Sequence, residues 1–284
     1  MFGNTREESH CERFQHFYRG TVTDMTRGPV DVYDDAAVNA WIQDDPDPVT
    51  RAELTELLAA ARSHGEQSDA AQAALADAFS GTLTFGTAGL RGRLGGGPNR
   101  MNRVVVIRAA AGLSAYLKNR VGEGFSVIIG YDARHNSEQF ARDTAAVVTG
   151  AGGRAILFES YCPTPVLAFA LRRLEADAGV MVTASHNPPQ DNGYKVYLGG
   201  LAVSDSGQGA QIVPPYDTQI AEAIDAVGPI ASVPRPQAGW ETVDPAIREE
   251  YVERAAQAAR MKAPAPVRIV LTAMHGVGGA TCRE

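Results

Sequence analysis

Three short apolar runs alternate with helical segments between residues 125 and 184, and this alternation constrains the fold more than any other feature. The runs are 125–130, 154–158 and 178–184, and helical patterns lie between them at 137–153 and 163–176. A β-α-β-α-β order predicts a parallel sheet that is covered on both faces by helices, and strands buried on both faces are apolar throughout. We therefore predict an α/β fold, in which helices sandwich a parallel sheet with mixed edges.

The segments on either side of this core predict three regions. Residues 1–80 form an N-terminal extension and helical arm, of which residues 1–30 are expected to be poorly ordered. In the arm, Thr50 and Glu53 have the spacing of a capping box at the start of a helix. The α/β domain follows over residues 81–228.

Residues 240–284 predict the start of a second α/β domain. The preceding stretch, 226–239, is rich in proline and glycine and has no periodicity, which is typical of a linker. A helix is expected over 244–261 and a strand over 267–271. One helix and one strand cannot bury a core of their own, so this second domain is expected to be only a beginning.

The composition narrows the possible partners. The net charge is −7, which argues against a nucleic-acid partner because such proteins usually carry a basic footprint. No apolar run approaches the roughly 20 residues of a membrane span. The three cysteines, Cys11, Cys162 and Cys282, are far apart and suggest no disulfide framework, so we expect a reducing, cytoplasmic location.

Polar residues follow two of the apolar runs directly. Asp132, Arg134 and His135 come after the first run, and Ser185 and His186 come after the third. Ligands bind at the carboxyl ends of the strands in a parallel α/β sheet. We therefore expect these side chains to converge on one edge.

The surroundings of Ser185 favour a phosphoserine over a hydrolase nucleophile. The G-x-S-x-G elbow is absent, and neighbouring Ser185 and His186 are expected to be poorly placed to pair as nucleophile and base. A phosphoserine needs cations to offset a charge of about −1.5 to −2. Arg91, Arg134, His186 and Lys195 are available for this.

A structural explanation of the same residues remains open at this point. Ser185 and Asn187 are residue types that commonly cap a turn before a proline such as Pro188. Lys195 alone is typical of a solvated surface lysine, and the glycine-rich stretch around Arg91 is typical of a surface hairpin.

Taken together, several motifs resemble the α-D-phosphohexomutases, the phosphoglucomutase/phosphomannomutase superfamily. The match is closest to the branch of phosphoglucomutase 2-like enzymes and covers about residues 35–284. The motifs are TASHNP (183–188) with NGYKVY (192–197), FGTAGLRGRLGGGPNRMN (85–102), GAQIVPPYD (209–217) and TAMHGVGG (272–279).

The resemblance implies roles for the candidate residues. Ser185 would be the phosphorylated residue, and its phosphate would also ligate Mg²⁺. Arg91 and Lys195 would line the catalytic site, with Lys195 as a candidate general acid or base, and His186 would support the phosphoserine. Arg134 and His275 would contact phosphate or substrate.

The reaction implied is an intramolecular phosphotransfer. Hexose 1-phosphate and hexose 6-phosphate, of glucose and also of mannose, would interconvert through a bisphosphate, with glucose 1,6-bisphosphate as primer. A phosphopentomutase is the second hypothesis for the enzymatic activity. The Asp-x-Asp-x-Asp metal loop of the family is missing from the sequence, so the other magnesium ligands are expected beyond the C-terminus. A catalytically incompetent N-terminal fragment that only binds a phosphosugar or a protein is therefore the alternative.

Overall fold

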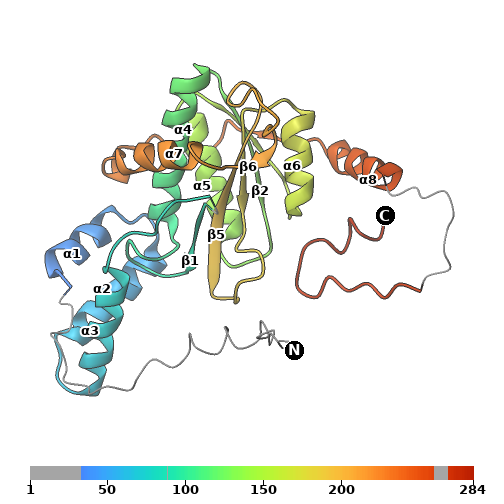
Figure 1. Cartoon of the computed structure of the whole chain (residues 1–284). Helices are drawn as coiled ribbons and strands as arrows, with labels where there is room; N and C mark the ends of the chain where they lie inside the picture. The colour runs from blue at the N-terminus through green and yellow to red at the C-terminus, as the bar shows by residue number, and fades with distance from the viewer. Residues whose placement is uncertain (1–32, 88, 259–267) are drawn as a thin grey trace, which may run out of the picture. The chain divides into compact units, whose positions relative to one another are not determined.

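The three apolar runs become parallel strands at the centre of the sheet (Figure 1). In the computed structural model, which describes residues 33–87, 89–258 and 268–284, β2 (Ser126–Tyr131) pairs with β3 (Arg154–Leu157) and with β4 (Ala178–Val182). The connecting helices are α5 (Ser137–Gly150) and α6 (Thr164–Arg173). The predicted β-α-β-α-β core is confirmed, whereas the expectation for residues 1–30 lies outside the described residues.

The remaining strands make the sheet a mixed one, as predicted. The order is β1-β5-β4-β2-β3-β7, and β6 (Ala210–Gln211) pairs with β5. The antiparallel side consists of β6, β1 (Leu90–Arg93) and β5 (Asp191–Leu198), while β7 (Glu241–Thr242) runs parallel to β3 at the other edge. The sequence had not indicated β5, although its run of aromatic and β-branched residues is typical of a strand.

Helices cover both faces of the sheet (Figure 1). One apolar cluster joins alternate strand residues such as Ile129 and Val180 to α5, to α4 (Arg103–Val121) and to α7 (Tyr216–Asp225). On the opposite face, a second cluster joins Ile128 and Ile156 to α6 and to α8 (Ala246–Ala258). Adjacent strand residues thus face opposite layers, which explains why the strands are apolar throughout.

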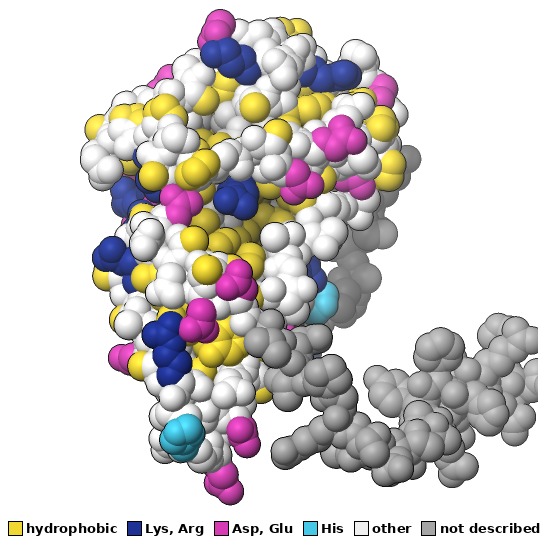
Figure 2. All heavy atoms as spheres, turned by 90° about the vertical axis from the view of Figure 1, so that its left-hand side faces the viewer, with side chains coloured by type: hydrophobic (Ala, Val, Ile, Leu, Met, Phe, Trp, Pro, Cys, Tyr) yellow, Lys and Arg dark blue, Asp and Glu magenta, His cyan; other side chains and the backbone are white. Residues whose placement is uncertain are grey.

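The helical arm consists of α1 (Asp35–Asp44), α2 (Pro48–Ala61) and α3 (Glu66–Ala78), which share an apolar cluster around Leu54 and Leu75. Figure 2 shows the side of the molecule that is on the left in Figure 1, where the arm lies. Acidic and basic side chains are interspersed on this face among the described residues, and no patch of a single sign forms there.

The predicted capping box at Thr50 and Glu53 is wrong. Helix α2 begins two residues earlier, at Pro48, because the Asp47 carboxylate accepts a hydrogen bond from the Val49 N–H (2.9 Å) and proline suits a first turn. Thr50 instead donates to Asp45 (2.6 Å). Glu53 accepts from the Gly96 N–H (3.0 Å) and so joins the arm to the glycine-rich loop.

The segment predicted as a linker is packed against the domain. The Asp44 carboxylate at the end of α1 accepts hydrogen bonds from the backbone N–H groups of Ile230 and Ala231 (3.0 and 3.1 Å). Ile230 is fully buried, and Val243 and Ile247 are buried in the cluster that includes α6. Residues 226–251 therefore contribute to the same core as the central strands.

The predicted strand at 267–271 is not found over its described part, residues 268–271. Ile269 and Val270 are 82% and 97% exposed, and no strand among the described residues pairs with them. A strand is held by hydrogen bonds to a neighbouring strand, so an apolar run without one stays irregular. Among the described residues, no helix is both long enough and apolar enough to span a membrane.

The approach of α4 to α7 depends on a glycine. A Cβ atom added to Gly112 would lie 2.5 Å from the Ile224 Cα. We expect Gly112→Ala to lower the free energy of unfolding by about 1–3 kcal/mol, since overpacking outweighs the better helix propensity of alanine. Urea denaturation followed by circular dichroism measures this loss.

Gly81→Ala is the matched control, because nothing lies within 4 Å of its added Cβ. It should change the free energy of unfolding by less than about 0.5 kcal/mol. Equal stability of the two variants would contradict the tight α4–α7 contact.

Candidate functional site

The loops that follow β2 and β4 lie next to each other at the carboxyl edge of the sheet. Although β3 lies between these strands in sequence, β4 pairs with β2 on the side away from β3. Helices α5 and α6 therefore cover opposite faces, and a crevice opens where the connections diverge. A cavity of about 510 Å³ lies there, lined by Asp132, Ala133, Arg134, His135, Ser185, Asn187, Pro189, His275, Gly276 and Val277.

Ser185 is held in an unusual backbone conformation. Its φ of 59° lies in the left-handed region, which residues other than glycine seldom adopt and which costs of order 1–3 kcal/mol. The Ser185 N–H donates to Thr183 Oγ1 (2.9 Å), and the Asn187 N–H donates to the Ala184 carbonyl (3.1 Å). The loop thus turns sharply after β4 and leaves Ser185 exposed at the cavity.

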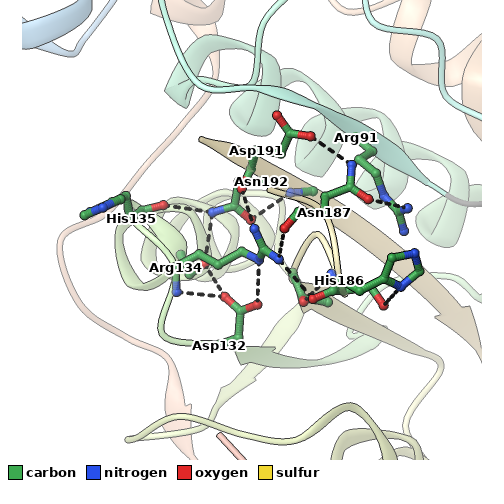
Figure 3. Close-up of polar contacts among 12 residues, drawn as sticks. Arg91, Asp132, Arg134, His135, His186, Asn187, Asp191 and Asn192 are labelled. Atoms are coloured by element: carbon green, nitrogen blue, oxygen red, sulfur yellow. Dashed lines mark hydrogen bonds and ion pairs between the residues drawn. The ribbon is translucent and has the colours of Figure 1, made fainter. Parts of the chain in front are cut away.

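Arg134 binds this loop from the neighbouring β2 connection (Figure 3). Its Nη1 donates to the carbonyls of Pro188 and Asp191 (2.9 and 3.0 Å). Its Nη2 donates to the carbonyls of Ser185 and Asn187 (2.9 and 2.8 Å). Its Nε faces Asp132 Oδ2 at 3.4 Å, and the side chain is only 15% exposed. The guanidinium therefore holds both ends of the serine loop.

A chain of buried polar contacts links Asp132 to β5 (Figure 3). The Asp132 carboxylate accepts from the Arg134 N–H (3.1 Å) and from Ser137 Oγ (2.7 Å). Asn192, which is fully buried, donates from Nδ2 to Ser137 Oγ and to the His135 carbonyl, both at 2.9 Å. Since each member has partners, the network fixes the relative positions of the two loops and β5.

Arg91 and Lys195 supply positive charge on one face of the antiparallel strands. Arg91 pairs with Gly193 in the β1–β5 register, so it shares a face with Lys195, two residues along β5. Arg91 Nη1 donates to Asn187 Oδ1 (3.1 Å), which ties it to the serine loop (Figure 3). Partial burial lowers the pKa of Lys195, and the Arg91 charge lowers it further, whereas Asp132 opposes this shift.

His186 lies closer to Ser185 than the sequence suggested. The expectation that the two neighbouring side chains are poorly placed to pair is wrong, because Ser185 Oγ is 3.3 Å from His186 Nδ1. The left-handed backbone of Ser185 brings them together. Among the described residues no carboxylate accepts a hydrogen bond from His186, and Asp132 is bound to Arg134 and Ser137, so a Ser-His-Asp triad is not assembled there.

The structure brings most of the candidate residues to one place. The residues that line the same cavity are Asp132, Arg134, His135, Ser185 and His275. The candidates that are not among its lining residues are Arg91, His186 and Lys195. Arg134 was predicted to contact phosphate or substrate, but its Nη1 and Nη2 groups donate hydrogen bonds to backbone carbonyls of the protein. Asn187 and Asn192 are central to the hydrogen-bond network, but the sequence indicated Asn187 only as part of a turn and Asn192 only as part of a motif.

The described residues do not by themselves fit a magnesium site. No group of three or more His, Cys, Asp or Glu side chains among them could hold a metal ion. Near Ser185, the Asp132 carboxylate is already bound by Arg134 and Ser137. Ser185 alone would supply a single ligand, whereas Mg²⁺ prefers six oxygens in an octahedron.

Comparison with known proteins gives a family match over half of the chain. Residues 82–228 match the family described as phosphoglucomutase/phosphomannomutase, alpha/beta/alpha domain I. A Haemophilus influenzae protein named "Probable phosphomannomutase" is 48% identical over 63% of this chain and 36% of its own length. A mouse phosphopentomutase is 32% identical over 84% of this chain and 38% of its own length.

A yeast relative and a solved structure agree with these matches. The Saccharomyces cerevisiae phosphoribomutase is 38% identical over 66% of this chain and 28% of its own length. A Thermus thermophilus crystal structure named "putative phosphomannomutase" superposes with a TM-score of 0.51 at 29% identity, over 63% of this chain and 36% of that one. The chain thus spans about a third of the length of the curated relatives that it matches.

The position of Lys195 predicts an unusual titration. We expect its amine to lose its proton below the ordinary lysine pKa of 10.5, because partial burial and Arg91 disfavour the charged form. Carbon-13 NMR of the reductively methylated protein follows this proton loss with pH, and Lys195→Arg assigns the signal. Arg91→Met should raise the pKa of Lys195, while Asp132→Asn should lower it. An unchanged pKa in Arg91→Met would contradict the placement of the two cations.

Proposed function

Because this chain belongs to the phosphoglucomutase/phosphomannomutase family, we propose that it carries the residue through which a sugar-phosphate mutase passes a phosphoryl group, Ser185. The observation that supports this most strongly is the exposed Ser185 hydroxyl on a strained loop that Arg134 holds at a topological switch point. A hydroxyl fixed at a cavity edge beside cations suits phosphoryl transfer, which requires positioning and charge stabilisation rather than complex covalent chemistry.

The first half-reaction loads the serine. The Ser185 oxygen attacks a phosphorus atom of glucose 1,6-bisphosphate, the bond from phosphorus to the sugar oxygen breaks, and the proton lost by Ser185 ends on that oxygen. In the reverse direction a sugar hydroxyl attacks the phosphoserine and gives up its proton. Lys195 is the proposed carrier of this proton, because its lowered pKa increases the neutral fraction that can accept it.

Other residues of the site stabilise the transferred group. Arg91 reaches the serine loop through Asn187, so its charge lies on the side from which the phosphoryl group would arrive. His186 Nδ1, at 3.3 Å from Ser185 Oγ, can hold the hydroxyl or its phosphate, and His275 lines the cavity at which Ser185 lies. The described residues do not complete a site for Mg²⁺.

The substrate we favour is a hexose monophosphate, of glucose with mannose as a second sugar. This rests on relatives named for phosphomannomutase and phosphoglucomutase activity. Pentose phosphates are the second candidate, since the mouse and yeast relatives are named for pentose and ribose. Cys162 and Cys282 are free, which fits a reducing compartment such as the cytoplasm.

Ser185→Ala should abolish phosphoryl uptake. Incubation of the wild-type chain with glucose 1,6-bisphosphate is expected to add one phosphoryl group, located at Ser185 by intact-mass measurement and peptide mapping. Ser206→Ala, a change of an exposed serine in a turn, is the matched control and should load normally. Uptake that persists in Ser185→Ala would contradict the assignment. Binding of the bisphosphate without uptake by the wild-type chain would indicate a phosphosugar-binding protein instead.

Discharge of the loaded chain separates the two substrate classes. Glucose 6-phosphate or ribose 5-phosphate is added to the phosphorylated protein, and the loss of phosphoserine is followed by mass. We expect faster discharge to the hexose phosphate. Faster discharge to the pentose phosphate would contradict the proposal of a hexose phosphate substrate and would favour a phosphopentomutase activity.

A further inference from the structure

We propose that Arg134 is a positioning residue, which sets the shape and the electrostatic potential of the Ser185 loop without touching the substrate. This inference rests on the proposed function of Ser185, and it departs from the phosphate-binding role that the sequence suggests for Arg134.

The N–H donors of the Arg134 guanidinium are all directed at the protein. A guanidinium has five N–H donors in a fixed fork. Four hydrogen bonds run from Nη1 and Nη2 to backbone carbonyls at distances of 2.8–3.0 Å, and Nε faces Asp132 at 3.4 Å. Every donor group therefore points at the protein, and none is directed at an incoming phosphate.

The four carbonyls belong to both sides of the serine loop. Two of them are those of Ser185 and Asn187, and the other two are those of Pro188 and Asp191, the residue that starts β5. The Arg134 fork therefore closes the loop between β4 and β5. It also holds the Ser185 carbonyl in the orientation that the left-handed backbone requires.

Charge gives Arg134 its second role. Without a cation, four carbonyl oxygens and the Asp132 carboxylate would present negative potential next to Ser185. A phosphoserine adds a charge of about −1.5 to −2 at the same place. The buried guanidinium offsets the potential of these oxygens, so the phosphoryl group meets Arg91 and Lys195 rather than a ring of acceptors.

The planar fork also explains why lysine cannot replace arginine here. An ammonium is a compact charge with three donors, and it cannot reach four carbonyls that lie around a plane. Arg134→Lys would keep the charge and lose most of the bridging, so it separates the electrostatic role from the positioning role.

The test compares Arg134→Met and Arg134→Lys with Arg142→Met. Arg142 lies on α5, forms an exposed ion pair with Glu138 as its sole salt-bridge partner among the described residues, and serves as the matched control. The initial rate of phosphoryl uptake at Ser185 is measured over a range of glucose 1,6-bisphosphate concentrations. Circular dichroism and thermal melting show whether each variant is folded.

A positioning role predicts a separation of the two kinetic parameters. In Arg134→Met the uptake rate at saturation should fall by about a hundredfold, which is typical of a displaced catalytic group, while the half-saturating concentration should stay within about twofold. Arg134→Lys should lie between Arg134→Met and the wild type, and Arg142→Met should match the wild type. A rise in the half-saturating concentration with an unchanged maximal rate would make Arg134 a substrate ligand and overturn the proposal.

Hydrogen exchange tests the same proposal without phosphoryl transfer. Amide exchange over residues 183–191 should accelerate in Arg134→Met, while exchange in β2 and β4 stays slow as in the wild type. If the wild-type chain takes up no phosphoryl group, the proposed function of Ser185 is wrong. Amide exchange over residues 183–191 still tests whether Arg134 positions the loop. Unchanged exchange over 183–191 in a folded Arg134→Met variant would overturn the positioning role by itself.

Discussion

The parallel pairing of β2 with β4 is the constraint on which the site depends. It places two loops side by side although β3 and α6 separate them in sequence. Each loop alone has the polar composition of an ordinary turn. Once they are adjacent, a single side chain from one loop can bind the backbone of the other, and a serine that would otherwise sample many conformations is held in one.

The site is built in layers around that contact. Arg134 holds the serine loop, Asp132 orients Arg134, and Ser137 with Asn192 joins Asp132 to β5. Strand β5 in turn carries Lys195, and β1 beside it carries Arg91. A frame of buried polar groups therefore supports two cations, of which Arg91 is also bound to the serine loop through Asn187.

The sequence was sufficient to predict the core of the fold. The three short apolar runs alternate with helical segments, which is typical of buried parallel strands, and the loops after them could be placed at one edge without coordinates. The family match agrees with the resemblance that the motif TASHNP suggested, whereas the role of Ser185 stays a prediction.

The contacts within the site could not be predicted in the same way. The role of Arg134 depends on four backbone carbonyls, and no side-chain pattern records where a carbonyl points. The Ser185–His186 contact depends on a left-handed φ, which serine rarely adopts. Asn192 was inconspicuous because its partners are 57 and 55 residues away in the chain. The exposed run at 268–271 was wrongly predicted as a strand. Strand formation depends on a neighbouring strand that can accept and donate backbone hydrogen bonds, and the sequence of the run alone does not show whether one is present.

Residues 226–251 pack as part of this domain, so its folding unit extends to them. The family match stops at residue 228, yet Ile230 fills the space beside α4, β7 extends the sheet, and Tyr251 stacks edge-on against Phe169 of α6 with ring centroids 5.7 Å apart. A chain cut at residue 228 would lose the contacts of Tyr251 and Ile247 with α6 and the pairing of β7 with β3. We therefore expect the unit that unfolds cooperatively to extend beyond the residues matched to domain I, and a fragment that ends at residue 228 to expose an apolar face.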